Sequence, residues 1–448
     1  MVSTGAGTGG AIDDRSAPER VGPSSRREWL VVFAILAAAL LLRVAVVLVI
    51  QSDYTPLTDA SDYDRIASSL AAGDGYGATS VPGAEGPSAF RAPMYPALLA
   101  AVYAVFGGHS WTWGLLENAV IGTALVAMIG VVGAQLFGRR VGLIALAIAA
   151  VHPTLALFGT SLQIEPLLAL LEMATIAAAV QHRRRPRGMR YALASGVLLG
   201  LTVLTREIGI WLIPTVVLLV WSERPRWSRR ALLVPAAALA AAIVVVSPWT
   251  VRNALRFSAL VPVTTTSGVG LAGVYNETSR QNTKDPGLWM GPWFDPGVAK
   301  IILADVHRDE AEQDRVLRAA AVDFAREHPG YVMEVAVWNT VRLFDLNGPG
   351  AAMFIRQFIP YPSGLTRASV YASYLIYALA AFGATRALRR RAPNALWLFP
   401  LLVWMNLAVL SGNIRYRASI EPFLVLLAAV GVASWHAARQ GAAEVRAE

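Results

Sequence analysis

The sequence WLVVFAILAAALLLRVAVVLVI, at residues 29–50, is an apolar run interrupted only by Arg43. A helix needs about 20 apolar residues to cross a bilayer, so this run is long enough to span one. A cleavable signal peptide has a shorter apolar core followed by a small-residue cleavage site, and no such site is clear here. We therefore expect an uncleaved first membrane helix.

Further apolar runs follow along the whole chain. They lie at residues 111–137, 141–162, 165–180, 191–205, 208–221, 231–249, 368–388, 395–410 and 419–436. The 448 residues are 55% hydrophobic and only 15% charged, against about 25% charged in soluble domains. The composition excludes a disordered chain, a disulfide scaffold and a nucleic-acid-binding domain, in spite of the net charge of +9. We expect an all-α polytopic membrane protein with about ten transmembrane helices.

Basic clusters fall in alternate connections between these runs. They are Arg139–Arg140, 183–187, 224–230 and 389–391. By the positive-inside rule these connections are cytoplasmic, and both termini lie on the same side. The expected organisation is a disordered cytoplasmic tail (1–28), a membrane domain (29–437) and a second cytoplasmic tail (438–448). Two long connections, 51–110 and 250–367, then face the outside. Arginine-rich, lysine-poor composition with abundant alanine is typical of a GC-rich bacterial genome, so we expect a bacterial plasma membrane.

The first external connection contains a short amphipathic segment at residues 58–70. At about 100° per residue, one helical stripe is formed by Tyr63, Ile66, Ala67 and Leu70. Asp59 and Asp62 lie on that stripe, which predicts that their carboxylates point toward the membrane-embedded body. The alternative is that Thr58 or Asp59 is only an N-cap. Asp64 and Arg65 fall on the other face, where we expect them to be solvated.

Several charged residues lie where spans meet the outside, against the positive-inside bias. They are Glu165, Arg206, Glu207, Arg252 and the pair Arg415 and Arg417, and Arg91 in the first external connection stands behind them. Each alone is compatible with an interfacial anchor. Together they favour a site that binds phosphate, which the guanidinium fork holds through two bonds. Arg43 lies deeper in the membrane, where either a cavity-facing role or a structural salt bridge is open.

The order of these motifs resembles bacterial glycosyltransferase family 39, which is similar to protein O-mannosyltransferases and to the aminoarabinose lipid A transferase. The likeness lies in Asp59-Ala-Ser-Asp62-Tyr63, Arg91-Ala-Pro93-Met-Tyr95-Pro96, 200–206, Pro248-Trp249-Thr-Val-Arg252-Asn253, 320–331 and Arg415-Tyr416-Arg417. The family often has Asp-Glu where this chain has Asp59-Ala60. The resemblance implies a GT-C helical bundle with an external active site and a lipid-linked sugar donor.

Chemistry and resemblance together predict an inverting glycosyltransferase that uses a polyprenyl-phosphate sugar. Asp59 matches the family's catalytic position and would accept the proton of the acceptor hydroxyl. Arginines would stabilise the departing phosphate. The expected substrate-binding residues are Asp62, Tyr63, Arg91, Glu165, Arg206, Arg252, Asn253, Arg415, Tyr416 and Arg417.

We expect no metal site and no cofactor, because a phosphate held by arginines does not require a divalent ion and His109 and His152 lack partners at metal-ligand spacing. The expected partners are the lipid-linked donor, an envelope lipid, glycan or protein acceptor, and membrane lipids, but no nucleic acid. The competing hypothesis is a membrane transporter or lipid flippase. Against it, the polar residues gather at the external ends of the spans rather than at the midplane.

Overall fold

The computed structural model describes residues 25–186, 188–222, 225, 227–257, 259–350, 361–387 and 392–447, without the side chains beyond 440. Among these residues there is no strand, only an isolated bridge between Ala78 and Pro87. The expected all-α membrane fold is confirmed. Most of the first tail and the arginines at 187, 224 and 389–391 lie outside the described residues.

Each apolar run forms helix. The elements are α1 (Arg26–Ala45) with a π-helical turn η1 (Val46–Ile50), α4 (Trp111–Phe137), α5 (Arg139–Val151), α6 (Pro153–Phe158), α7 (Glu165–Arg184), α8 (Arg190–Thr205), η2 (Glu207–Leu212), α9 (Ile213–Val220), α10 (Arg229–Phe257), α16 (Ser363–Ala387), η5 (Asn394–Trp397), α17 (Leu398–Leu410) and α18 (Glu421–Ala447). Within the described part of the chain, five helices are long and apolar enough to cross a membrane: α1 with η1, α4, α10, α16 and the first part of α18. The other apolar helices are shorter.

Several expected helix boundaries were wrong; α18, for example, continues past the expected end at His436 to Ala447. The run at 141–162 is not one helix, because Pro153 has no N–H to donate and begins the new helix α6 after His152. Helix α10 continues to Phe257, past the expected end at Trp249, and includes Pro248. Arg252 and Asn253 therefore lie inside a helix rather than in the loop that follows it.

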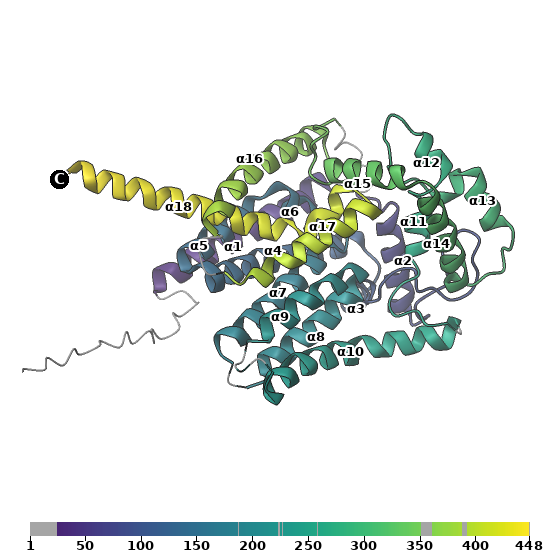
Figure 1. Cartoon of the computed structure of the whole chain (residues 1–448), viewed down its shortest axis with the longest axis horizontal. Coiled ribbons are helices and arrows are strands. Elements are labelled where there is room, and N and C mark those ends of the chain that lie inside the picture. The colour runs from purple at the N-terminus through teal and green to yellow at the C-terminus, as the bar shows by residue number, and fades with distance from the viewer. Residues whose placement is uncertain are drawn as a thin grey trace, which may run out of the picture.

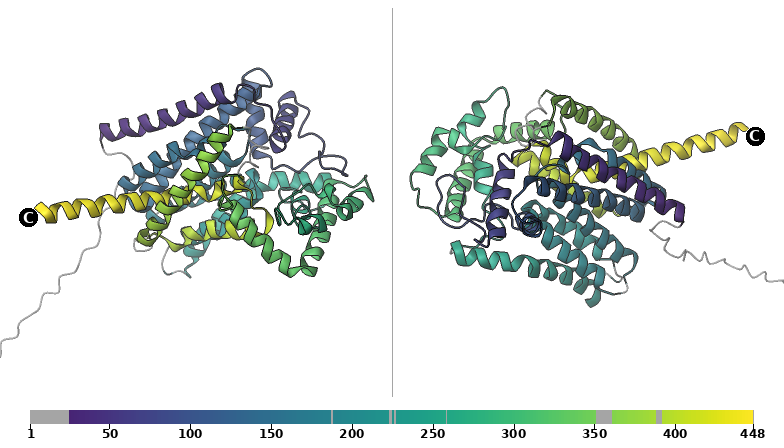
Figure 2. Two further views of the ribbon diagram at one scale, coloured as in Figure 1. Left: turned by 90° about the horizontal axis from the view of Figure 1, so that it is seen from above. Right: turned by 180° about the vertical axis from the view of Figure 1, so that it is seen from behind.

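The remaining elements form a layer at one end of the bundle, and several of them pack directly against its helices. They are α2 (Asp59–Ala72), α3 (Met94–Val105), α11 (Ser267–Ala272), α12 (Glu277–Gln281), η3 (Pro292–Phe294), α13 (Pro296–Leu303), α14 (Glu310–Glu327), α15 (Pro329–Leu343) and η6 (Ile414–Ser419). Helices α11 to α14 gather at the right in Figure 1, and the C-terminus lies at the opposite end. The two further views place this layer at the same end, with α1 along one side of the bundle (Figure 2).

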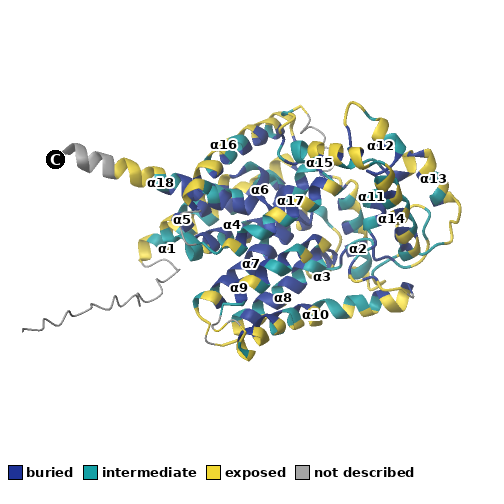
Figure 3. Cartoon of the chain, viewed as in Figure 1, coloured by how far each residue is buried: buried dark blue, intermediate teal, exposed yellow. Residues whose placement is uncertain are grey.

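The core lies in the middle of the bundle, where α4, α7 and α18 contribute fully buried side chains such as Ile129, Met173 and Leu426 (Figure 3). Close packing, rather than water exclusion, holds membrane helices together, and small residues allow it. Gly383 illustrates this, since a Cβ there would overlap the Leu427 carbonyl oxygen of the neighbouring helix α18. Helix α1 instead exposes most of its apolar surface, as expected for contact with lipid.

Candidate functional site

Helix α2 begins with an unusual backbone turn at Thr58. Its φ of 53° lies in the left-handed region, which a β-branched residue rarely adopts. Thr58 occupies the N-cap position, but its side chain accepts no capping hydrogen bond. Asp59 is the first residue of the helix and its carboxylate pairs with arginines instead. Asp59 is therefore not an N-cap, and Thr58 holds that position without a side-chain capping bond.

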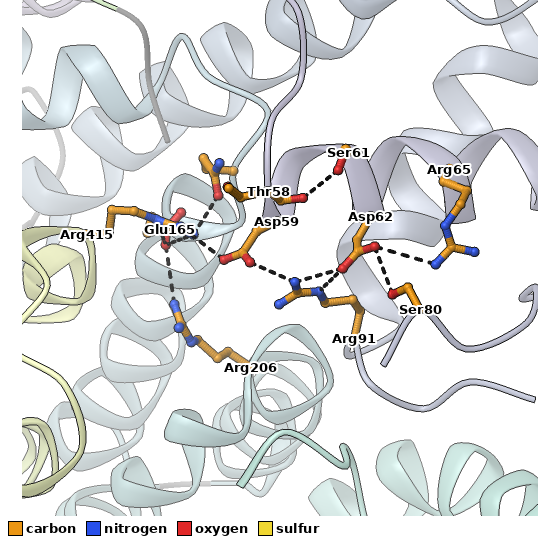
Figure 4. Close-up of polar contacts among 11 residues, drawn as sticks. Thr58, Asp59, Ser61, Asp62, Arg65, Ser80, Arg91, Glu165, Arg206 and Arg415 are labelled. Atoms are coloured by element: carbon orange, nitrogen blue, oxygen red, sulfur yellow. Dashed lines mark hydrogen bonds and ion pairs between the residues drawn. The ribbon is translucent and has the colours of Figure 1, made fainter. Parts of the chain in front are cut away.

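The Asp59 carboxylate lies between two arginines that come from distant parts of the chain (Figure 4). Arg91 Nη2 donates to Oδ1 at 2.7 Å, and Arg415 Nη1 donates to Oδ2 at 3.0 Å. The side chain of Asp59 is 22% exposed, so a substrate group can still reach it. The predicted inward orientation of Asp59 is confirmed.

Asp62 holds the same arginine from the next helical turn. Arg91 donates to Asp62 Oδ2 through Nε at 3.1 Å and through Nη2 at 2.8 Å. Ser80 donates to Asp62 Oδ1 at 3.0 Å. The Arg91 guanidinium also lies 5.4 Å from the ring centre of Tyr63, which is buried in the α2–α3 interface. Asp62 and Tyr63 thus fix the direction of Arg91.

Glu165 forms the second half of the site at the start of α7 (Figure 4). Its Oε1 accepts from Arg415 Nη2 at 3.0 Å and Nε at 3.2 Å, and from Arg206 Nη1 at 3.3 Å. Gln163 accepts a further bond from Arg415 Nη2 at 2.6 Å. The Arg206 guanidinium lies 4.1 Å from the ring centre of Tyr416, so these two residues are in contact.

The resulting cluster, here called the Asp59 network, joins Asp59, Asp62, Glu165, Arg91, Arg206 and Arg415 and has equal numbers of carboxylates and guanidinium groups. Burial raises the pKa of Asp59, but the attraction of Arg91 and Arg415 outweighs burial and holds this pKa well below its usual range. Asp59 is therefore ionised at neutral pH. Arg415 is 1% exposed, whereas Arg206 is 23% exposed. Arg206 is the cation with the better access for an anionic ligand.

Arg252 and Asn253 lie beside the network and hold backbone groups. Arg252 Nη1 donates to the Ser88 carbonyl oxygen at 2.7 Å and to Asn253 Oδ1 at 2.9 Å. Asn253 donates to the carbonyl oxygens of Val261 and Val263. These contacts support the loops around Arg91 and do not point Arg252 at Asp59.

Arg417 lies in a different buried cluster. It donates to Asp345 Oδ2 at 2.8 Å and to Glu421 Oε1 at 2.5 Å, and all three side chains are at most 3% exposed. His152 Nε2 lies 3.3 Å from Glu421 Oε2. The structure therefore separates Arg417 from Arg415, although only one residue stands between them in the sequence.

Two further charged residues differ from the simplest expectation. Asp64 was expected to be solvated, but its side chain is 14% exposed and accepts hydrogen bonds from Tyr103 and Trp111, with His109 at 2.9 Å. Arg43 is fully buried and donates to the carbonyl oxygens of Ala39 and Ala150 rather than to a carboxylate. Among the described residues, no group of three or more His, Asp and Glu side chains is arranged to hold a metal ion.

Two members of the site were not predicted. Gln163 pairs with Arg415, and Tyr76 donates its hydroxyl to the Arg91 carbonyl oxygen at 2.6 Å while its ring lies 5.5 Å from the Arg252 guanidinium. Neutral polar residues in loops give no periodic signal, so neither stood out. Tyr76 could have been found from its position in a glycine-rich turn between Asp62 and Arg91.

Comparisons with known proteins find a similar sequence pattern and a similar fold. Residues 90–251 match a family model described as dolichyl-phosphate-mannose-protein mannosyltransferase. A comparison with curated protein sequences gives no match.

Solved structures with a similar fold include the Archaeoglobus fulgidus oligosaccharyltransferase AglB in complex with an inhibitory peptide and a dolichol-phosphate. The TM-score is 0.55 at 13% identity, over 92% of this chain and 51% of that chain. The apo form gives 0.54 at 14% identity, over 91% and 51%. ArnT from Cupriavidus metallidurans bound to undecaprenyl phosphate gives 0.44 at 16% identity, over 91% and 78%.

The chain spans about half the length of the oligosaccharyltransferases that it resembles. The similarity covers the helical bundle and the layer at its end together, since it extends over nine tenths of this chain. Residues 90–251 thus have the sequence pattern of the dolichyl-phosphate-mannose-protein mannosyltransferase family, and the chain as a whole has the GT-C glycosyltransferase fold that its sequence predicts.

Proposed function

We propose that this protein is an inverting glycosyltransferase that moves a sugar from a polyprenyl-phosphate donor to a hydroxyl acceptor at the outer face of a bacterial plasma membrane. The observation that carries the proposal is the Asp59 carboxylate, held at the start of α2 between Arg91 and Arg415 and still partly accessible. A carboxylate beside several guanidinium groups suits a reaction that needs a base and releases a phosphate.

In the proposed reaction the acceptor oxygen attacks the anomeric carbon from the side opposite the phosphate. A carbon–oxygen bond to the acceptor forms, the bond to the phosphate oxygen breaks with its electron pair, and the configuration inverts. Asp59 accepts the hydroxyl proton. Its low pKa makes it a weak base, so we place its contribution at the lower part of the range for general bases, about 10²–10³-fold.

Arg206 is the strongest candidate for binding the donor phosphate. Arg91 is occupied by two aspartates and Arg415 by Asp59, Gln163 and Glu165. Arg206, by contrast, pairs with Glu165 at 3.3 Å and is more exposed. Negative charge grows on the phosphate as the glycosidic bond breaks. A guanidinium group placed there stabilises the transition state more than the bound donor.

The donor class is supported by the similar AglB structure, which contains a dolichol-phosphate, and by the family description that matches residues 90–251. The proposed side of the membrane is supported by charge. Helix α5 begins at Arg139, α10 begins at Arg229 and α7 ends just after Arg183, and these helix ends lie away from α2 (Figure 1), so the positive-inside rule favours a cytoplasmic position for them. Asp59 then faces outside, where a lipid-linked donor replaces nucleotide sugars.

The competing proposal is a transporter or flippase for a lipid phosphate. The buried Arg43 and the Arg417 cluster favour it, because charges inside a bundle often mark a transport path. Both groups, however, are enclosed by protein and bonded to carbonyl oxygens or carboxylates. We therefore rank it second.

A cryo-EM structure of the purified protein with undecaprenyl phosphate separates the two proposals. Glycosyl transfer predicts phosphate density within hydrogen-bond distance of the Arg206 guanidinium and near Asp59. Density at mid-membrane beside Arg43 would contradict the enzyme and favour transport.

A further inference from the structure

We propose that Glu310, on α14 of the large external connection, is a positioning residue for Arg91 and so for the catalytic carboxylate. This inference rests on the proposed function, because it assigns Glu310 a role in that same site. It gives the external layer a specific task, which is to hold the backbone next to the Asp59 network.

The backbone at residues 88–91 is held from four different elements. Glu310 Oε2 accepts from the Ala89 N–H at 2.7 Å. The Ala89 carbonyl oxygen accepts from the Thr265 N–H at 3.3 Å. Arg252 donates to the Ser88 carbonyl oxygen, and Tyr76 donates to the carbonyl oxygen of Arg91 itself. Every one of these bonds ends within three residues of the Arg91 side chain.

Glu310 is the anchor that reaches this segment from farthest away. It lies 221 residues from Ala89 in the sequence and is 1% exposed. The same oxygen, Oε2, accepts from the Thr265 hydroxyl at 2.9 Å, so one carboxylate joins both external connections. A hydrogen bond from a backbone N–H to a buried carboxylate is charge-assisted and holds its geometry more tightly than a neutral one.

The α14 helix sets where this carboxylate lies. Asp309 is the N-cap, and its side chain accepts from the Glu312 N–H at 2.8 Å, so Glu310 is the first helical residue. Four residues later, Asp314 caps α11 through Gly268 and Ser267. Of these two carboxylate contacts of α14, the Glu310 contact is the one that reaches the backbone beside Arg91.

Small displacements in this segment matter because Arg91 and Asp59 are 2.7 Å apart. A misplacement of about 1 Å at reacting groups reduces rates by about 100-fold. Loss of the Glu310 anchor would also weaken the contact that keeps Asp59 ionised. Loss of the Glu310 anchor should therefore change kcat and its dependence on pH. It should change donor binding little, because we assign donor binding to Arg206.

The test compares Glu310→Asp with Glu310→Gln in the full-length purified protein. Aspartate keeps the charge but is one methylene too short to reach Ala89, whereas glutamine keeps the reach and an acceptor oxygen. We expect Glu310→Asp to lower kcat for transfer from a polyprenyl-phosphate sugar about 10- to 100-fold, with donor KM changed less than about threefold. We expect Glu310→Gln to stay within about threefold of wild type. In a plot of kcat against pH, the pH below which kcat falls should be higher in Glu310→Asp than in wild type. It should not change in Glu310→Gln.

Asp314→Asn is the matched control, since it weakens the other docking point of α14 and should keep wild-type turnover. Adding Glu310→Asp to Arg91→Ala should cause no further loss. Equal losses in Glu310→Asp and Asp314→Asn, or additive losses in the double variant, would overturn the proposal. A cryo-EM map of Glu310→Asp tests it without activity: the Arg91 guanidinium should leave Asp59, and an unchanged Arg91 would refute the role. Absence of transfer by the wild-type protein would instead refute the proposed function.

Discussion

Replacement of Arg206 by alanine is the cleanest probe of the donor phosphate site. The substitution removes one ion pair, at 3.3 Å to Glu165, and the stacking of the guanidinium on Tyr416 at 4.1 Å. Glu165 keeps its two bonds from Arg415, so it is not left as an unpaired buried charge. A partly exposed ion pair is worth about 0–1 kcal/mol and a cation–π contact about 0.5–1 kcal/mol. We expect a loss of about 0.5–2 kcal/mol in the free energy of unfolding, which leaves a folded protein.

The catalytic effect should be larger than the effect on folding. A charge-assisted hydrogen bond contributes about 1.5–3 kcal/mol, so loss of the phosphate contact should lower kcat/KM about 10- to 100-fold. Arg206→Lys should recover only part of this, because lysine has no bidentate fork. Arg415→Ala is a poorer probe. It removes a buried ion-pair partner from both Glu165 and Asp59, which lowers the free energy of unfolding by about 3–5 kcal/mol. A loss of activity in this variant could then come from unfolding as well as from catalysis.

The assay is steady-state transfer from a polyprenyl-phosphate sugar, with thermal unfolding of each variant measured in parallel. Tyr416→Phe is the control, since it keeps the aromatic ring under Arg206 and should leave donor kinetics unchanged. If Arg206→Ala is folded and its donor kinetics equal those of wild type, Arg206 does not bind the phosphate and the inference from its exposure is refuted.

Three further results are expected. Arg184→Cys in this cysteine-free chain should resist impermeant thiol reagents applied outside, whereas Asp305→Cys should react; the reverse pattern would contradict the topology. Thr58→Gly should keep activity and unfold at the same or a higher temperature, because glycine relieves a positive φ that costs about 1–3 kcal/mol, and a clear fall in stability would be against this. Arginines lower the pKa of Asp59 in the folded protein, so the stability that the ionised carboxylate contributes is lost only as pH falls below the pKa of an unfolded aspartate, about 3.9. The transfer rate should therefore not fall near pH 5. In Arg91→Ala, the pH below which the transfer rate falls should be higher than in wild type.

The sequence predicted most of what depends on local periodicity. The apolar runs predicted the helices, and the stripe on residues 58–70 predicted the inward direction of Asp59, which reaches Arg415. Asp62, on the same stripe, instead contacts Ser80 and Arg91 of its own connection. The sequence could not separate Arg415 from Arg417. These residues lie on a 3₁₀ helix with three residues per turn, so side chains two positions apart point about 120° away from each other, into different clusters.

Other features depend on contacts between distant segments, which a single sequence does not show. Asp64 was expected to face water because the helical wheel of α2 cannot include Tyr103 and Trp111, which cover it. Glu310 lies in an acidic amphipathic helix where a buried glutamate looks like its solvated neighbours. Its contact with Ala89, which lies in the segment between α2 and α3, is the basis of the role that we propose for it.

Sugar transfer by purified Asp59→Asn protein tests the central claim most directly. Asparagine keeps the size of the side chain and can still accept one arginine bond, but it cannot take a proton at neutral pH. Arg91 retains Asp62, and Arg415 retains Glu165, so the fold should survive. Asp62→Asn, on the same face one turn away, is the matched control and should lose less. With a radiolabelled polyprenyl-phosphate sugar as donor, we predict at least about a 100-fold lower turnover in Asp59→Asn, with donor binding retained. Turnover equal to wild type in Asp59→Asn would contradict the carboxylate mechanism and return transport of a lipid phosphate to first place.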